Sequence, residues 1–195
     1  MPNRYSTNDP YTYDDSPVLK NKGNFCTDKE LAEYEILCVT RRMVEDPPDG
    51  GFDYAHLKRL HHHLFQDVYE WAGRERDVHI SKGNSRFATP VNIRPQAEAL
   101  FAQLASEDFL VRLDLETFAS RAAYYVSELN ALHPFREGNG RVIRLFLFLL
   151  AEKAGFDLDP DVLETRWLNA SIEAFTHDES MMTALLTEAL SKFEE

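Results

Sequence analysis

The strongest constraint on the fold is a polar loop that runs directly into an apolar segment. Residues 133–144 read His-Pro-Phe-Arg-Glu-Gly-Asn-Gly-Arg-Val-Ile-Arg, and residues 145–151 continue as Leu-Phe-Leu-Phe-Leu-Leu-Ala. Because this run is apolar all round, the helix that it predicts, from Asn139 to Ala154, belongs in the core. Gly155 supplies its C-cap. The sequence therefore predicts a functional loop fixed at the beginning of a buried helix.

The loop has the composition of a phosphate site. Glycines on both sides of Asn139 free the backbone for positive φ and for close approach of a ligand. The first amides of a helix lack intrahelical partners and the helix dipole is positive there, so Gly138 and Gly140 would favour a bound phosphate. Arg141 and Arg144 share a helix face, from which two guanidinium groups can reach a polyphosphate together.

Two more side chains of the loop point to chemistry. Glu137 would repel a phosphate unless a hard cation lay between them, and Mg2+ held by one carboxylate and by phosphate oxygens is the usual arrangement. His133 has the only side chain in the loop with an ordinary pKa near neutrality, which makes it the natural general base. The alternative is an ordinary helix start beside a surface histidine, but a helix cap requires neither two glycines nor these charges.

The stretch from His133 to Arg144 resembles, with no departure, the signature of Fic domains, which is His-x-Phe-x-Asp/Glu-Gly-Asn-Gly-Arg-x-x-Arg. The resemblance implies an all-α Fic fold, a bundle of about seven or eight helices with a small β-hairpin flap over the active site. It also implies transfer of AMP from ATP to a Ser, Thr or Tyr hydroxyl of a target protein. The site residues that it implies are His133 as the base, Glu137 for Mg2+, Gly138, Asn139, Gly140, Arg141 and Arg144 for the ATP phosphates, and Phe135 to pin the loop to the core.

Two other functions stay open. A Fic fold can transfer another phosphate-containing group, although the intact Glu137–Arg141 segment favours AMP. It can also be a catalytically silent module that binds nucleotide or protein, but the intact His133 argues against this because a binder needs no base. A P-loop ATPase is excluded because no glycine loop ends in Gly-Lys-Ser/Thr.

Charge and cysteine content limit the partners and the location. With 33 acidic and 21 basic residues, the net charge of −12 argues against direct binding of nucleic acid, which depends on clustered Lys and Arg. Cys26 and Cys38 form no disulfide framework, so a reducing compartment is expected. The N-terminus lacks the apolar core of a signal peptide, and no apolar run approaches the about 20 residues that span a membrane. We therefore expect a bacterial cytoplasmic protein, with injection into a host cell as the alternative.

The chain divides into an N-terminal arm or hairpin over residues 1–26 and a single Fic domain over residues 27–195, with the catalytic loop at 133–141. Periodicity predicts helices over residues 28–44, from about 53, and over 95–106, 115–132 and 139–154, with two more in 161–193. The predicted buried set of the last two includes Leu168, Ile172 and Met181. The pattern of residues 78–90 around a Gly-Asn turn predicts a hairpin. By the resemblance it is a flap that aligns the target's main chain, with Lys82 and Gly83 as the candidate contacts; an ordinary exposed turn is the alternative.

Two further features concern metal binding and regulation. Histidines 61–63 are adjacent on a helix and point about 100° apart, so they cannot close on one metal and are expected to be structural. Many Fic proteins are inhibited by a helix of pattern Ser/Thr-x-x-x-Glu-Gly/Asn, whose glutamate would pair here with Arg144. Residues 191–195 match only its serine and glutamate. The resemblance is therefore to toxin-type Fic proteins, with a separate small antitoxin supplying the glutamate and a type II topoisomerase subunit as one target.

Overall fold

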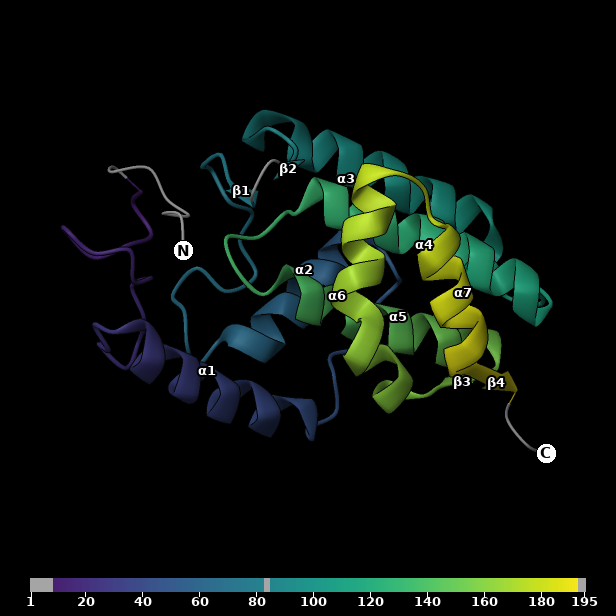
Figure 1. Cartoon of the computed structure of the whole chain (residues 1–195), viewed down its shortest axis with the longest axis horizontal. Coiled ribbons are helices and arrows are strands. Elements are labelled where there is room, and N and C mark those ends of the chain that lie inside the picture. The colour runs from purple at the N-terminus through teal and green to yellow at the C-terminus, as the bar shows by residue number, and fades with distance from the viewer. Residues whose placement is uncertain (1–8, 83–84, 193–195) are drawn as a thin grey trace.

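The protein is mainly helical, as predicted. The structure, a computed structural model, describes residues 9–82 and 85–192. The α-helices of these residues are α1 (Asp28–Met43), α2 (Tyr54–Phe65), α3 (Pro90–Ser106), α4 (Leu115–Leu132), α5 (Asn139–Ala154), α6 (Pro160–Thr176) and α7 (Ser180–Ala189), with the short 3-10 helix η1 (Asp108–Leu110) between α3 and α4 (Figure 1). None of the helices in the described part of the chain is long and apolar enough to cross a membrane.

Helix α5 lies in the centre of the bundle, as Figure 1 shows, and packs against α2 and α4. Its buried face includes Val142, Phe146 and Leu150, each at most 2% exposed. Its boundaries agree with the prediction, and Gly155 ends it with a φ of 86°. Other apolar side chains of α5 are only half-buried, so the helix is central without being covered on every side. The core therefore fixes the first turn of α5, where the loop ends.

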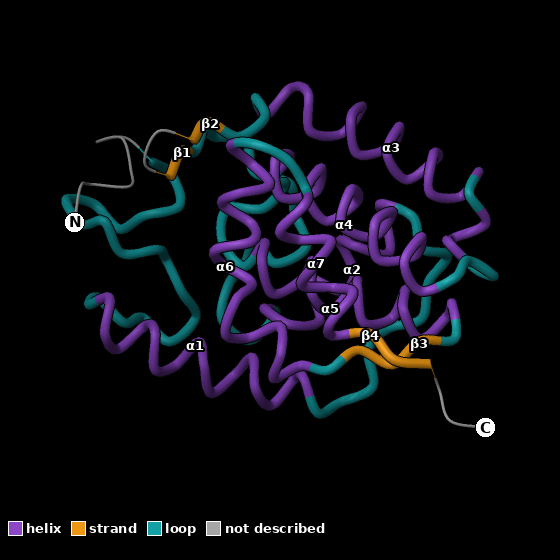
Figure 2. Tube along the Cα trace, turned by 45° about the vertical axis from the view of Figure 1, so that its right-hand side comes forward, coloured by secondary structure: helices purple, strands orange, loops and turns teal. Residues whose placement is uncertain are grey.

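Two short antiparallel strand pairs accompany the helices. β1 (Ser81–Lys82) pairs with β2 (Ser85–Arg86), which confirms the predicted hairpin. β3 (Phe156–Leu158) pairs with β4 (Leu190–Lys192) beside the end of α5, as the tube in Figure 2 shows. The second pair was not predicted, because residues 190–192 were assigned to a helix. The backbone becomes extended at Leu190, with φ −88° and ψ 136°, because pairing with β3 supplies its hydrogen bonds.

Two parts of the helix prediction were wrong. Helix α3 begins at Pro90 and contains Pro95, where we expected its start. Proline inside a helix removes one hydrogen bond, and the buried face of α3 offsets that loss. Leu168, Ile172 and Met181 were expected in the core but are about half exposed, at 57%, 52% and 48%. Helix α6 instead turns Leu163, Trp167 and Ala170 inward, because α4 and α7 pack against that face.

The N-terminal arm packs on the domain. A β-bridge joins Thr12 to Leu19, so the described part of the arm is a small hairpin, and Leu19 is buried in the core. Asp9 forms an ion pair with Arg136 of the catalytic loop at 2.5 Å, and both side chains are at most 5% exposed. Residues 1–8 lie outside the described part of the chain. The arm is thus a support of the loop rather than a separate unit.

Candidate active site

His133 is the C-cap residue of α4 and the first residue of the loop. Its backbone is left-handed, with φ 47° and ψ 62°, and its ring lies parallel to that of Phe87 at 3.8 Å between centroids. Nδ1 lies 3.0 Å from the carbonyl oxygen of Asn130. Because a carbonyl oxygen only accepts hydrogen bonds, Nδ1 of the neutral ring carries the proton and Nε2 carries the lone pair. This tautomer is the one that a general base at Nε2 requires.

Asn139 closes the loop on itself. Its Oδ1 accepts from the backbone N–H of Phe135 at 2.9 Å, and its Nδ2 donates to the Phe135 carbonyl oxygen at 2.7 Å. The Asn139 side chain is 2% exposed, and the Phe135 ring is fully buried against the ring of His61 at 3.9 Å. The side-chain amide is therefore used inside the loop, and the backbone N–H is the group of Asn139 that can bind a phosphate.

Replacing Asn139 with alanine is expected to destabilise the protein by about 2–4 kcal/mol, because two hydrogen bonds are lost and the buried N–H and C=O of Phe135 lose their partners. Affinity for ATP should fall with stability, since the loop would no longer hold its shape. Thermal unfolding and calorimetric titration with ATP measure the two effects. Asn130→Ala is the control, because among the described residues the Asn130 side chain makes one long bond, of 3.4 Å, to the Ser171 carbonyl oxygen. Equal unfolding temperatures for the two variants would contradict the prediction.

The two glycines of the loop have different roles. Gly138 adopts a φ of 81°, and a Cβ there would lie 2.3 Å from the ring of Phe65. Gly140 is helical, and a Cβ there would meet only Trp167 Nε1 at 3.9 Å. Only Gly138 thus has the positive φ expected for both. In the described structure, the backbone amides of Asn139 and Gly140 at the start of α5 donate no hydrogen bond, which leaves them for an anion.

Arg141 and Arg144 extend from α5 in different environments. Arg141 forms an ion pair with Glu35 of α1 at 2.6 Å, and the other oxygen of Glu35 accepts from the Tyr69 hydroxyl. The Arg144 guanidinium lies 5.6 Å from the centre of the Trp167 ring, and no carboxylate of the described residues pairs with it. Burial, and then the charge of Arg141, lower the pKa of Arg144. Both effects favour binding of an anion at Arg144.

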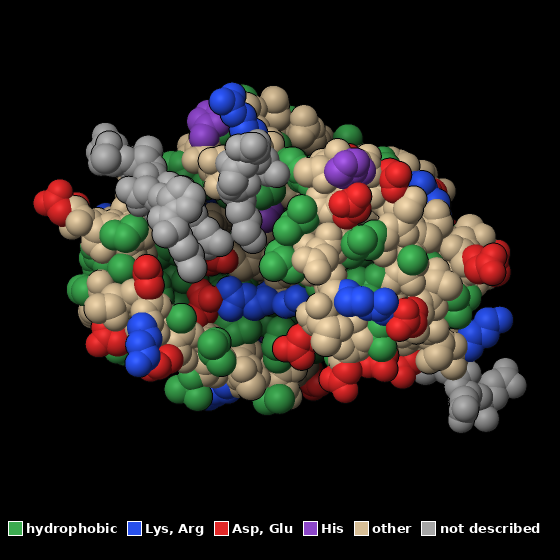
Figure 3. Space-filling model, in the orientation of Figure 1, with side chains coloured by type: hydrophobic (Ala, Val, Ile, Leu, Met, Phe, Trp, Pro, Cys, Tyr) green, Lys and Arg blue, Asp and Glu red, His purple; other side chains and the backbone are tan. Residues whose placement is uncertain are grey.

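Figure 3 shows Lys and Arg side chains across the middle of one face, bordered by Asp and Glu. Glu137 directly precedes Gly138 in the loop. Its side chain is 35% exposed. Its Oε1 accepts from the Gly138 N–H at 3.0 Å and lies 3.8 Å from Nη2 of Arg141. No group of three or more His, Cys, Asp or Glu side chains among the described residues could hold a metal ion. The donor set therefore fits a Mg2+ that takes one carboxylate and completes its shell with phosphate oxygens and water.

His61 of α2 holds the loop through Phe135 and Glu137, a role that the sequence analysis did not predict. It is fully buried between the rings of Phe135 and Phe65. Its Nε2 donates to the Glu137 carbonyl oxygen at 3.0 Å, and its Nδ1 accepts from the Gly73 N–H at 2.9 Å. These two hydrogen bonds give His61 a structural role in holding the loop. Spacing within α2 predicts burial of this position but not its bond to Glu137, 76 residues away.

Burial lowers the pKa of His61 to about 3. The unfolded chain therefore binds one more proton than the folded protein between about pH 3 and pH 6.5, so stability rises with pH over that window. Between pH 7 and pH 5 we expect His61 alone to reduce the free energy of unfolding by about 2 kcal/mol. Urea unfolding at both pH values measures the change. A His61→Gln variant should lose this part of the pH dependence; an unchanged dependence would contradict the assignment.

The flap is described only in part. Gly83 lies outside the described residues, as does the side chain of Lys82, so both expected contacts stay predictions. The stem is described: Phe87 packs on the His133 ring, and the Ala88 N–H donates to the Ala131 carbonyl oxygen at 3.2 Å. The hairpin therefore stands directly beside the candidate base.

Comparison with known proteins identifies the family. The sequence model of the Fic/DOC family matches residues 51–151, which is just over half of the chain and includes the whole loop. The chain belongs to the Fic/DOC family. The structure of this Fic chain is similar to the crystal structure of the BepC effector protein of Bartonella tribocorum with bound AMPPNP. The TM-score is 0.86 over 94% of this chain and 97% of that one, at 28% identity.

Two relatives have names that state an activity. The Fic chain is 44% identical over 178 residues to the probable protein adenylyltransferase y4lH of Sinorhizobium fredii, and this match covers 90% of the chain and 93% of y4lH. It is 42% identical over 191 residues to the protein adenylyltransferase VbhT of Bartonella schoenbuchensis, of which it spans 40%. The similarity thus extends well beyond the loop to nearly the whole chain.

Proposed function

We propose that this Fic protein is a protein adenylyltransferase, which transfers AMP from ATP to a hydroxyl side chain of a target protein. The observation that carries the proposal is the tautomer of His133, whose Nε2 can accept a proton, on the same loop as the open amides of Asn139 and Gly140. A base and an anion site lie on one loop. The protein adenylyltransferases named above, similar over nine-tenths of the chain, support AMP as the group transferred.

The reaction follows from these positions. Nε2 of His133 takes the proton of the acceptor hydroxyl, and the oxygen attacks the α-phosphorus of ATP. The bond from that phosphorus to the bridging oxygen breaks, and pyrophosphate leaves with the electron pair. The guanidinium groups of Arg141 and Arg144 and the amides of Asn139 and Gly140 stabilise the phosphate charge. Alignment of the hydroxyl and removal of its proton are the tasks of the loop.

Glu137 is the residue that would hold Mg2+, whose bound charge helps neutralise the phosphates. Its half-exposed carboxylate next to the open amides supports this role. Phe135 and Asn139 hold the loop shape, and Gly138 allows the turn. The flap would align the target's main chain by strand addition through Lys82 and Gly83.

Regulation and targets extend the proposal. The inhibitory pattern has no complete copy in the sequence, and Ser191, its only possible start, lies in strand β4 rather than in a helix. No carboxylate of the described residues forms an ion pair with Arg144, on which Glu164 acts only through its charge, and this supports a separate antitoxin that supplies a carboxylate there. A toxin of this type would act in the bacterial cytoplasm, with a type II topoisomerase subunit as one target. Similarity to Bartonella effectors supports delivery into a host cell as the alternative.

The test uses ATP labelled at either the α or the γ phosphate, incubated with Mg2+, the protein and a bacterial lysate. Adenylyl transfer predicts that the α label stays on protein and that the γ label does not. Retention of the γ label would instead identify phosphoryl transfer. ATP binding with no label on any bacterial or host protein would identify a silent binding module.

A further inference from the structure

Arg76 is the largest fully buried side chain among the described residues, with 2% of its surface exposed. It lies between α2 and β1. Its guanidinium donates to four carbonyl oxygens: Nε to His133 at 2.7 Å, Nη1 to Val78 at 2.7 Å, and Nη2 to Ala88 at 2.6 Å and to Leu132 at 3.3 Å. No carboxylate of the described residues pairs with it, so carbonyl dipoles compensate the buried charge.

These four carbonyls belong to two separate parts of the site. Val78 and Ala88 lie at the two ends of the flap hairpin, before β1 and after β2. Leu132 ends α4, and His133 begins the catalytic loop. The backbone N–H of Arg76 adds a bond to the carbonyl oxygen of Pro134 at 2.9 Å. One residue therefore joins both ends of the flap to the loop that carries the base.

The bond to His133 satisfies a group that the end of a helix leaves open. The last carbonyls of α4 have no intrahelical donor, and the left-handed backbone of His133 costs free energy for any residue other than glycine. Arg76 supplies donors to the carbonyls of both Leu132 and His133. Its contacts stabilise the backbone conformation that turns the His133 ring toward Asn130.

We propose that Arg76 is a positioning residue that couples the flap to His133, and that it keeps the hydroxyl-accepting side of the active site assembled. The inference rests on the proposed function, since it assigns this side of the site to the target protein. Arginine is required because its planar group directs donors at carbonyls in several directions. A lysine ammonium has three donors on one atom and cannot reach all four.

The phosphate side of the site has its own supports. Asn139 fixes the loop through Phe135, and the first turn of α5 is held by the bonds from the Arg141 and Val142 amides to the Gly138 carbonyl oxygen. None of these bonds involves Arg76. Loss of the Arg76 contacts should therefore impair AMP transfer to protein much more than ATP binding.

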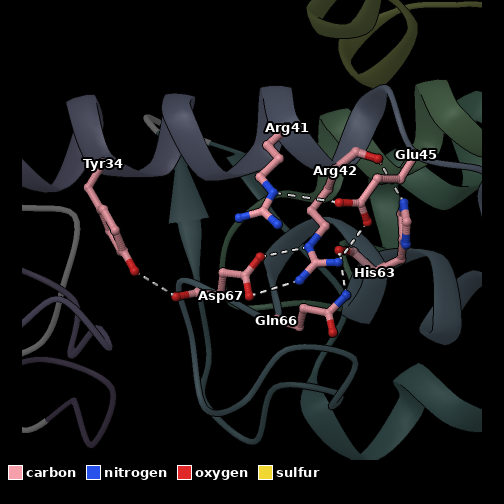
Figure 4. Close-up of polar contacts among 7 residues, drawn as sticks. All are labelled: Tyr34, Arg41, Arg42, Glu45, His63, Gln66 and Asp67. Carbon is pink, nitrogen blue, oxygen red and sulfur yellow. Dashed lines mark hydrogen bonds and ion pairs between the residues drawn. The ribbon is translucent and has the colours of Figure 1, made fainter.

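Arg76→Lys tests the proposal, and Arg42→Lys is the matched control. Arg42 lies at the end of α1 and forms a two-bond pair with Asp67, Nε to Oδ2 at 2.6 Å and Nη2 to Oδ1 at 3.0 Å (Figure 4). It also pairs with Glu45 at 2.7 Å, and its carbonyl oxygen contacts His63. Both substitutions remove a guanidinium fork and keep the charge, but the described contacts of Arg42 involve neither flap nor loop.

Three measurements are made on each full-length variant: hydrogen exchange of single amides by NMR, calorimetric titration with ATP and Mg2+, and the rate of transfer. In Arg76→Lys, exchange of the amides of residue 76 and Ala88 should accelerate at least about tenfold, because the bonds that hold the flap stem are weakened. Exchange of the Arg141 amide and ATP affinity should change less than about threefold, while transfer falls about 100-fold because the base is misplaced. Arg42→Lys should change neither the exchange of these amides nor transfer.

Several results would overturn the inference. One is exchange of the Ala88 amide that matches the Arg42→Lys control; another is an ATP affinity that falls as far as transfer does. If Arg76→Lys does not fold, a Phe87→Leu variant tests the inference instead. It removes the stacking of the Phe87 ring on the His133 ring and leaves the Arg76 hydrogen bonds in place. Ala88 should then stay protected, and its release would show that the ring, not Arg76, holds the flap. Absence of AMP transfer by the wild-type protein would count against the proposed function alone, since exchange and ATP binding still test Arg76.

Discussion

A His133→Ala variant is expected to lose AMP transfer to protein while it keeps ATP binding. Nε2 of His133 is the proton acceptor in the proposed reaction, and loss of a general base reduces a rate by about 100-fold to 10,000-fold. ATP affinity should stay within about threefold, because the amides and guanidinium groups that bind phosphate come from residues 139–144. Initial rates with labelled ATP and calorimetric titration of the same preparations measure the two quantities.

The control for this variant is His177→Ala. His177 caps the end of α6, is exposed, and pairs only with Glu173 and Thr176 of its own helix among the described residues. It should transfer AMP at the wild-type rate. Transfer by His133→Ala at more than about one-tenth of the wild-type rate would remove the assignment of His133 as the base.

A Gly138→Ala variant is expected to lose both stability and ATP binding. The left-handed backbone at Gly138 costs alanine about 1 kcal/mol, and a Cβ 2.3 Å from the buried ring of Phe65 adds about 1–3 kcal/mol of overpacking. Phe65 cannot move aside easily, because it packs on His61, which is itself fixed by two hydrogen bonds. Thermal unfolding and ATP titration should both show the loss.

Two other glycines separate the causes. Gly155 has a similar φ of 86°, but a Cβ there would meet no atom within 4 Å, so Gly155→Ala should cost only about 1 kcal/mol and leave ATP binding unchanged. Gly140→Ala should preserve the unfolding temperature, because the residue is helical and its nearest contact would be 3.9 Å away. It should still weaken ATP binding if the first turn of α5 approaches the phosphates. Equal stability of Gly138→Ala and Gly155→Ala would contradict the packing argument.

Local sequence patterns predicted the features that depend on neighbours along the chain. Helix α1 begins at Asp28, as predicted, and Thr27 caps it, because its Oγ1 accepts from the Glu30 N–H at 3.3 Å. Helix α5 begins and ends where glycine and the apolar run indicate. The residue types of the loop predicted an anion site because each contributes a donor or a charge of its own. These features require no knowledge of the tertiary structure.

Contacts between distant residues could not be predicted in this way. Glu35 pairs with Arg141 across 106 residues, and Asp9 pairs with Arg136 across 127. Both pairs depend on how the arm and α1 pack against the loop, and no spacing within a helix encodes that. The same holds for Arg76, a basic residue in a polar segment, which is buried against four carbonyl oxygens. Long-range hydrogen bonding, rather than helix periodicity, determines the shape of the active site.

The most direct test of the central claim is mass spectrometry of the protein that becomes labelled in a lysate. Wild-type protein and His133→Ala are incubated in parallel with Mg2+ and ATP, and the labelled band is digested and sequenced. The account predicts AMP on a Ser, Thr or Tyr hydroxyl of one peptide with the wild-type protein and no AMP on that peptide with His133→Ala. AMP on the same peptide at equal levels with both proteins would contradict it.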